Sequence, residues 1–364
     1  MFKQRVLRIT LPIAVLLIGI TATWHFLRSV HVEVDVKQIV PHQQSLYVLT
    51  GTRSGGNRCC SEVQMIDTRT GSRKHLLKVQ GSVSEIAVSP GGKLAIAREQ
   101  GPWVLPRKIY VSDGVSASLK PCIGLGARPS WLNDDLLLYL SLVNRRNVNE
   151  PPTGSNEASR SQTPWNATSL MSTALIQGSR PRTLRTWEDA VVVKISSGWM
   201  CVLDGTTAAL STISPAQDGG VRIGTAMQLP VHLGDRRYVT RVAISSLGQV
   251  AIPAGTSSRS GASAVDHVFG LFDSGGFRGT SPPASGPIQD LVWAPDGQSL
   301  AAIICKGESS WEVARINSER RWQTIWRSTS KLAHLAALDK GRFVVVAGKN
   351  RVIIIPTGID YLVE

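Results

Sequence analysis

The 364-residue sequence lacks the short motifs that carry catalysis in the common enzyme classes. It contains no Gly-x-Ser-x-Gly nucleophile elbow, no His-Glu-x-x-His zinc motif, no Walker phosphate loop and no kinase motif set. Its seven histidines are scattered, and no Cys and His spacing resembles a zinc site. These absences favour a binding or scaffold function without a metal or a cofactor. An enzyme that gathers its site at the centre of the fold stays as the alternative.

Cysteine is also sparse, and its five positions follow no regular spacing. An odd, irregular set is not a disulfide framework. We expect Cys122, Cys201 and Cys305 to lie in strands, where a free cysteine packs as a small apolar residue. Cys59 and Cys60 are adjacent in a glycine-rich segment and are expected to be more exposed. The sequence leaves the disulfide status of all five open.

Acidic residues are outnumbered, with 26 Asp and Glu against 40 Lys and Arg and a formal net charge of +14. The first 30 residues hold four basic and no acidic residues, so 14 − 4 leaves about +10 on the remainder. A basic surface attracts anions. No nucleic-acid recognition motif is present, so an anionic envelope component or a partner protein is the expected ligand. A general arginine bias of the composition is the alternative cause of the charge.

One long hydrophobic run is present near the N-terminus. Residues 9–27 contain no Asp, Glu, Lys or Arg, and at ~1.5 Å per residue they reach about 28 Å, close to a bilayer core. Lys3, Arg5 and Arg8 precede the run, which predicts a cytoplasmic segment 1–8, a signal-anchor helix 9–27 and an extracytoplasmic remainder. Secretion after signal-peptide cleavage near Ala22 is the alternative. A linker is expected at 28–32.

The rest of the chain repeats one pattern of an apolar run, a tight polar turn and a second apolar run. The clearest copies span 88–97 (VSPGGKLAIA) and 293–302 (WAPDGQSLAA). A period near 45 residues with four short strands is typical of a β-propeller. We therefore predict an all-β fold, a β-propeller over 33–364, most consistent with seven four-stranded blades and preceded by the transmembrane helix. The expected blades are 33–80, 82–124, 127–186, 188–229, 238–285, 288–328 and 331–364, with six or eight blades as alternatives.

These repeats resemble those of a known family. The Trp-Ala-Pro-Asp-Gly-Gln segment from Trp293, and the segment from Val88 that leads on to Ile109-Tyr-Val-Ser-Asp-Gly, are similar to the WD-type repeats of TolB-like propellers. The resemblance implies architecture and carries no catalytic residue. The same register makes Trp131 equivalent to Trp293, and both are expected to be buried between neighbouring blades.

The long connections between strands are the expected place for binding, because function concentrates in long loops on a rigid scaffold. With strands A to D running outward in each blade, the A–B and C–D turns share one face, and the B–C and D–A connections share the other. The second set holds nearly all the long segments, including a flexible insertion at 144–168. It also places basic residues from several blades around one mouth of the ring. The predicted binding residues are Arg53, Arg58, Arg107, Lys108, Arg145, Arg146, Arg236, Arg237 and Lys306.

Overall fold

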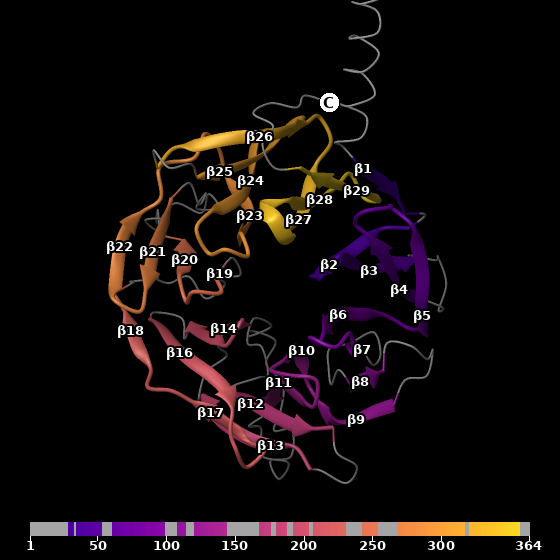
Figure 1. Cartoon of the computed structure of the whole chain (residues 1–364), viewed down its shortest axis with the longest axis vertical. Helices are drawn as coiled ribbons and strands as arrows, with labels where there is room; N and C mark the ends of the chain where they lie inside the picture. Colours follow the sequence, from indigo (N-terminus) through magenta and orange to yellow (C-terminus); the bar gives the residue numbers. More distant parts are fainter. Residues whose placement is uncertain are drawn as a thin grey trace, which may run out of the picture.

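The computed structural model describes residues 28–32, 34–52, 60–98, 108–113, 120–143, 167–175, 180–187, 192–203, 207–230, 242–253, 268–316 and 320–356. These segments form seven antiparallel sheets arranged in a ring (Figure 1). The protein is therefore an all-β, seven-bladed β-propeller, as the repeats predict. Within these residues no helix is long and apolar enough to cross a membrane. The run 9–27 and most of the insertion expected at 144–168 lie outside the described residues.

The first four blades follow one another along the chain. Blade 1 contains β2 (Val36–His42), β3 (Ser45–Thr52), β4 (Cys60–Asp67) and β5 (Arg73–Gln80). Blade 2 contains β6 (Val83–Val88), β7 (Leu94–Arg98), β8 (Lys108–Ser112) and β9 (Lys120–Leu125). Blade 3 contains β10 (Ala127–Trp131), β11 (Leu136–Val143), β12 (Ala167–Ala174) and β13 (Arg182–Trp187). Blade 4 contains β14 (Val192–Ser196), β15 (Trp199–Leu203), β16 (Ala208–Pro215) and an outer edge shared by β17 (Val221–Ile223) and β18 (Met227–Leu229).

The remaining blades complete the ring. Blade 5 contains β19 (Ala243–Ile244), β20 (Val250–Pro253), β21 (Phe269–Asp273) and β22 (Gly276–Thr280). Blade 6 contains β23 (Ile288–Trp293), β24 (Leu300–Gly307), β25 (Ser310–Ile316) and β26 (Trp322–Ser328). Blade 7 contains β27 (Leu332–Ala337), β28 (Phe343–Ala347) and β29 (Arg351–Ile355), with the short 3-10 helix η1 (Asp339–Gly341) between its first two strands. Its outer strand is β1 (Arg28–His31).

Strand β1 corrects the expected linker at 28–32 and the expected seventh blade built from 331–364 alone. It pairs antiparallel with β29, from Arg28 opposite Ile354 to His31 opposite Arg351. Val30 and Val32 are buried in the cluster between blades 7 and 1, while Ser29 and His31 are exposed. The segment therefore has the period-2 alternation of a half-buried strand. The N-terminal end of the propeller thus closes the ring against its C-terminal strand.

The core is divided among the blade interfaces. Among the described residues there are seven hydrophobic clusters, one between each pair of neighbouring blades. In β7, for example, Leu94 and Ile96 pack toward blade 1, whereas Ala95 and Ala97 pack toward blade 3. The second strand of a blade is buried on both faces, which explains its continuous apolar sequence. The ring therefore has no single central core.

The two tryptophans at the ends of inner strands are equivalent, as expected, but they are only half-buried. The Trp131 indole N–H donates to the Ala87 carbonyl at 3.2 Å, and the Trp293 indole N–H donates to the Ala243 carbonyl at 3.3 Å. Each acceptor belongs to the inner strand of the preceding blade. The indole nitrogen bonds to backbone close to the centre of the ring, so part of the side chain stays in contact with solvent. This corrects the expectation of full burial.

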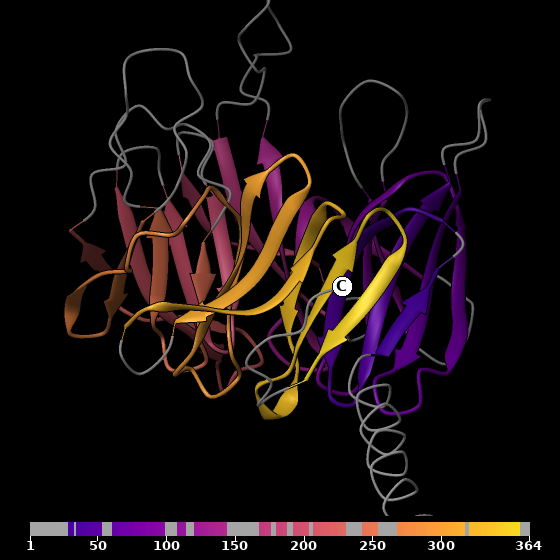
Figure 2. The same cartoon turned by 90° about the horizontal axis from the view of Figure 1, so that it is seen from above.

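The strand order gives the ring two distinct faces, seen edge-on in Figure 2. We call the face with the A–B and C–D turns the turn face, and the face with the B–C and D–A connections the loop face. The connection from Ala347 to Arg351 is a B–C connection, so Arg351 lies at the loop face and Ile354 toward the turn face. Because Arg28 pairs with Ile354, the chain enters β1 from the turn face.

Candidate functional site

A group of polar residues lies on the inner strands near the centre of the ring. We call it the collar, and it comprises Gln38, Glu85, Arg128, Lys194, Asp290 and His334, one from each of six blades. Glu85, Arg128, Asp290 and His334 each lie three residues before the end of their strand, closer to the loop face. The corresponding position in blade 5, Arg241, lies outside the described residues. Four blades therefore place a collar residue at the same position of the inner strand, whereas Gln38 and Lys194 lie four and two residues before the ends of their strands.

Four members of the collar join their own blade to the next one, and one of them is His334 of blade 7, which bonds to the backbone of Val36 in blade 1. The Gln38 side chain accepts from the Ile86 N–H at 2.7 Å and donates to the Ile86 carbonyl at 3.1 Å. A Glu85 carboxylate oxygen accepts from the Arg128 N–H at 2.6 Å, and an Asp290 carboxylate oxygen accepts from the Leu335 N–H at 2.8 Å. These bonds satisfy inner-strand backbone groups that no strand can pair at the centre of a ring. At these four positions the collar has a structural role.

Irregular backbone accompanies the collar. The pairing of the inner strand with its neighbour shifts register beside five of the six residues, and a β-bulge of this kind redirects a side chain. Arg128 and His334 also have left-handed φ values of 52° and 53°. Such a conformation costs a non-glycine residue ~1–3 kcal/mol and clusters at functional sites. Blade 4 has no such shift between β14 and β15, and Lys194 lies nearer the turn face than the other members.

A cavity of about 240 Å³ opens beside the collar. Arg128, Ser130 and Lys194 line its polar side together with Gln38 and Glu85. Its apolar side extends toward the interface of blades 3 and 4, at Leu140, Leu170 and Val193, among other residues. In the described part of the chain, the Arg128 guanidinium and the Lys194 ammonium have no hydrogen-bond or ion-pair partner. The cavity thus presents two uncommitted cations beside an apolar wall.

Ionisation at the centre of the ring is costly. The Lys194 side chain is exposed to the solvent at the centre of the ring, but protein surrounds it on its other sides. The resulting loss of hydration lowers the pKa of Lys194, although the Asp290 and Glu85 carboxylates oppose this shift. Desolvation likewise raises the pKa of Asp290, although the Leu335 and Leu291 N–H groups oppose the shift. Desolvation also lowers the pKa of His334. All three shifts favour the neutral forms. A bound anion would act in the opposite direction on Lys194, because a nearby negative charge favours the charged amine.

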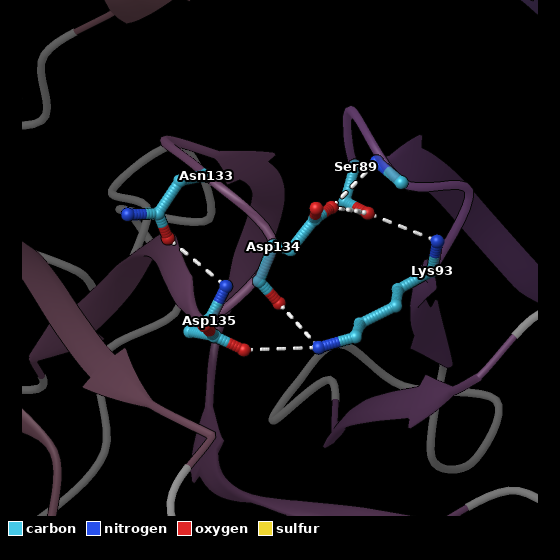
Figure 3. A network of polar contacts seen from close by, with 6 residues as sticks. Ser89, Lys93, Asn133, Asp134 and Asp135 are labelled. Atoms are coloured by element: carbon cyan, nitrogen blue, oxygen red, sulfur yellow. Dashed lines mark hydrogen bonds and ion pairs between the residues drawn. The ribbon is translucent and has the colours of Figure 1, made fainter.

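A second polar network lies on the turn face between blades 2 and 3 (Figure 3). An Asp134 carboxylate oxygen accepts from the Ser89 hydroxyl at 2.7 Å and from the Gly91 N–H at 2.5 Å. Lys93 donates to the Asp134 carbonyl at 2.8 Å and pairs with Asp135 at 3.0 Å. A Cβ on Gly91 would come within 2.7 Å of both Asp134 carboxylate oxygens, so a larger residue here would displace the Asp134 carboxylate from its hydrogen bonds. The hydrogen bond from Ser89 lowers the pKa of Asp134, and the network acts as a clasp between blades.

Comparison with known proteins agrees with the fold. No family model and no curated protein sequence matches this chain. The β-propeller domain of the Trilobed protease from Pyrococcus furiosus superposes with a TM-score of 0.58 at 12% identity, covering 89% of this chain and 93% of that chain. A chain of the mitotic checkpoint complex gives a TM-score of 0.55 at 13% identity, with 91% and 95% covered.

Pyrococcus horikoshii acylaminoacyl peptidase gives a TM-score of 0.57 at 11% identity over 86% of this chain. The match covers 49% of the peptidase, so this chain spans about half of that enzyme's length. At such low identities the matches show the β-propeller fold alone. The TolB-like character suggested by the repeats stays a resemblance.

Two of the predicted binding residues lie within the described segments. Lys108 begins β8 and is exposed, and Lys306 lies near the end of β24; both are at the loop face. The Lys306 ammonium pairs at 2.9 Å with Glu312, a carboxylate that is only 4% exposed. Its charge is therefore partly neutralised. The other predicted residues lie outside the described residues: Arg53, Arg58, Arg107, Arg145, Arg146, Arg236 and Arg237.

Sequence reasoning missed the collar, although the sequence contains a signal for it. Most inner strands carry an apolar residue, any residue, a polar residue and a second apolar residue, as in Val83-Ser-Glu85-Ile and Ile288-Gln-Asp290-Leu. A polar side chain repeated at one place in otherwise apolar strands indicates a shared position near the axis. The expected strand positions of Cys201 and Cys305 are confirmed: Cys201 is buried in β15, and burial raises its pKa to about 12.

Proposed function

We propose that this chain is a single-pass membrane protein whose extracytoplasmic propeller binds an anionic envelope component or partner protein without catalysing a reaction. The membrane segment is the charge-free run 9–27, and the basic residues before it favour a cytoplasmic N-terminus. Strand β1 starts immediately after the run. Anchoring and cleavage near Ala22 are both compatible with ring closure, because either leaves β1 intact.

The direction of β1 supports an orientation for the propeller. The chain enters β1 at the turn face, directly after the proposed membrane segment. The turn face would then lie toward the bilayer, and the loop face would point away from it. The predicted basic loops and the collar side of the ring would be open to a partner in the envelope.

The observation that carries the binding proposal is the pair of cations at the cavity. Arg128 and Lys194 line one space, and both lack a hydrogen-bond partner among the described residues. Both side chains are exposed at the centre of the ring, and two neighbouring positive charges there attract an anion. An anionic ligand that enters from the loop face would supply the missing partner.

Three measurements test the proposal. Protease added outside spheroplasts should digest the propeller, whereas protection of the whole domain would refute the orientation.

Capture of envelope components by the full-length protein should weaken as salt rises, because exposed charges are screened over ~8–10 Å. Reversing the charge of Arg145, Arg146, Arg236 and Arg237 together should abolish capture. The matched control reverses four exposed basic residues of outer strands: Lys74, Lys78, Arg182 and Arg222. Equal capture by both variants would contradict a binding role for the loop face.

An enzyme with a central site is the second candidate, and the lowered pKa of Lys194 is the observation that favours it. A desolvated amine keeps a larger neutral fraction, which can act as a base or a nucleophile. Turnover of an envelope-derived ester or amide that Lys194→Met abolishes, with binding retained, would favour this candidate over the binding module.

A further inference from the structure

The collar has different roles in different blades. Gln38, Glu85 and Asp290 are engaged with the backbone of the next blade. Arg128 and Lys194, in blades 3 and 4, make no such bond, and they line the cavity. Ring closure therefore does not explain why the collar carries cations in these two blades. The side-chain N–H donors of Arg128 and Lys194 are therefore available to a molecule in the cavity.

The cavity itself combines two environments. Arg128, Lys194 and the hydroxyl-bearing Ser130 line one part. Leu140, Leu170 and Val193, which belong to the buried cluster between blades 3 and 4, line another. Its volume of about 240 Å³ is well above the ~10–15 Å³ needed to hold one water molecule, yet below the ~300–1,000 Å³ of typical ligand pockets. A small molecule or a terminal group of a larger one matches this size.

Charge narrows the ligand class further. Two basic side chains and the Glu85 carboxylate line the cavity, so the formal charge of its lining is 2 − 1 = +1, and the Asp290 carboxylate outside the lining also acts on Lys194. A carboxylate carries one negative charge and matches this value. A phosphate carries about two negative charges, so it would exceed the positive charge of the lining and would repel the Glu85 carboxylate. The planar Arg128 guanidinium can bind a carboxylate with two parallel hydrogen bonds. The Lys194 ammonium can donate a third.

We propose that this cavity binds a carboxylate that carries a small apolar group, with the carboxylate on Arg128 and Lys194 and the apolar group against Leu140 and Val193, at the edge of the buried cluster between blades 3 and 4. The proposal rests on the binding function proposed above and names the chemistry of its central subsite. Two sources share this chemistry, a free organic acid and the C-terminus of a protein chain that ends in an apolar residue.

Titration calorimetry on the full-length protein in nanodiscs tests the site with N-acetyl-leucine. The matched probe is N-acetyl-leucinamide, which has nearly the same size and shape but carries a neutral amide in place of the carboxylate. N-acetyl-leucine should bind saturably and the amide should not. A peptide ending in leucine distinguishes the sources: tighter binding of the peptide indicates a chain terminus, and binding of the free acid alone indicates a small molecule.

Lys194→Met should weaken binding of N-acetyl-leucine by about tenfold or more, because hydrogen bonds to charged groups are among the strongest. Arg128→Asn is the second variant, since Asn tolerates the left-handed φ of this position and should leave the fold intact. Lys78→Met, on the exposed outer strand of blade 1, is the control and should bind as wild type. Equal binding of acid and amide, absence of binding by the wild type, or unchanged binding by both cavity variants would overturn the proposal. If capture of envelope components persists while N-acetyl-leucine fails to bind, the subsite is wrong and the binding module stands.

Discussion

Closure of the ring by residues 28–32 predicts a large loss of stability when the two buried side chains of this segment are trimmed, Val30 in β1 and Val32 directly after it. Val30 is 9% exposed and Val32 is 1% exposed, and both pack in the cluster between blades 7 and 1. Replacing both by alanine leaves the backbone pairing with β29 possible. The substitution therefore tests the packing of the strand rather than its hydrogen bonds.

The magnitude follows from the carbon atoms removed. Each Val→Ala change deletes two buried carbons, worth about 1.6 kcal/mol at ~0.8 kcal/mol per CH₂. The two sites together lose about 3 kcal/mol, and the remaining cavities add to this. We expect a loss of about 3–5 kcal/mol, a large share of the ~5–15 kcal/mol that stabilises a typical protein.

Urea unfolding of the full-length protein, followed by tryptophan fluorescence, measures the effect. The control is Ser29→Ala with His31→Ala, on the exposed side of the same strand, and it should stay within ~0.5 kcal/mol of wild type. If the valine pair and the control pair unfold at the same urea concentration, residues 28–32 are a linker and the closure of the ring described above is wrong.

Three further substitutions test other contacts. Trp293→Ala should lower the free energy of unfolding by about 2–4 kcal/mol, below the ~3–5 kcal/mol of a fully buried aromatic residue, because the indole is half-buried; an unchanged melting temperature would refute its packing role. Asp134→Asn should lower the free energy of unfolding at neutral pH. Its difference from wild type should shrink as pH falls from ~3.9 through the lowered pKa of Asp134, because the wild-type carboxylate then becomes protonated. A difference in unfolding free energy that grows in acid would contradict the clasp. Lys306→Met leaves the buried Glu312 with weaker partners and should cost about 1–3 kcal/mol in urea unfolding, whereas a surface pair would cost under ~1 kcal/mol.

The repeats predicted the architecture well because each blade contains its own signal. The turn at Pro90 to Gly92 and the apolar strand after it set the register of blade 2, and the same pattern recurs around the ring. The outer strand of blade 7 could not be found in this way. It comes from the other end of the chain, so no local turn connects it to β29, and Ser29-Val30-His31-Val32 is too short to indicate a strand alone.

The collar shows a different limit of sequence reasoning. Charge and loop length pointed to the rim of the ring, where exposed basic residues are easily recognised. Glu85 and Lys194 are separated by more than a hundred residues and become neighbours only because seven inner strands converge on one axis. Whether a side chain bonds to the next blade, as Gln38 does, or stays uncommitted, as Arg128 does, depends on bulges that the sequence does not reveal.

The central claim, that Lys194 and Arg128 form an anion-binding site at the centre of the propeller, is tested most directly by the ionisation of Lys194 itself. Competitive acetylation of the full-length protein over a range of pH, read residue by residue by mass spectrometry, measures when this amine becomes neutral. We predict a midpoint below the ~10.4 of an ordinary lysine, and a shift to higher pH when N-acetyl-leucine is added, because a bound anion favours the charged amine. A midpoint that the acid and its amide leave at the same pH would contradict the claim.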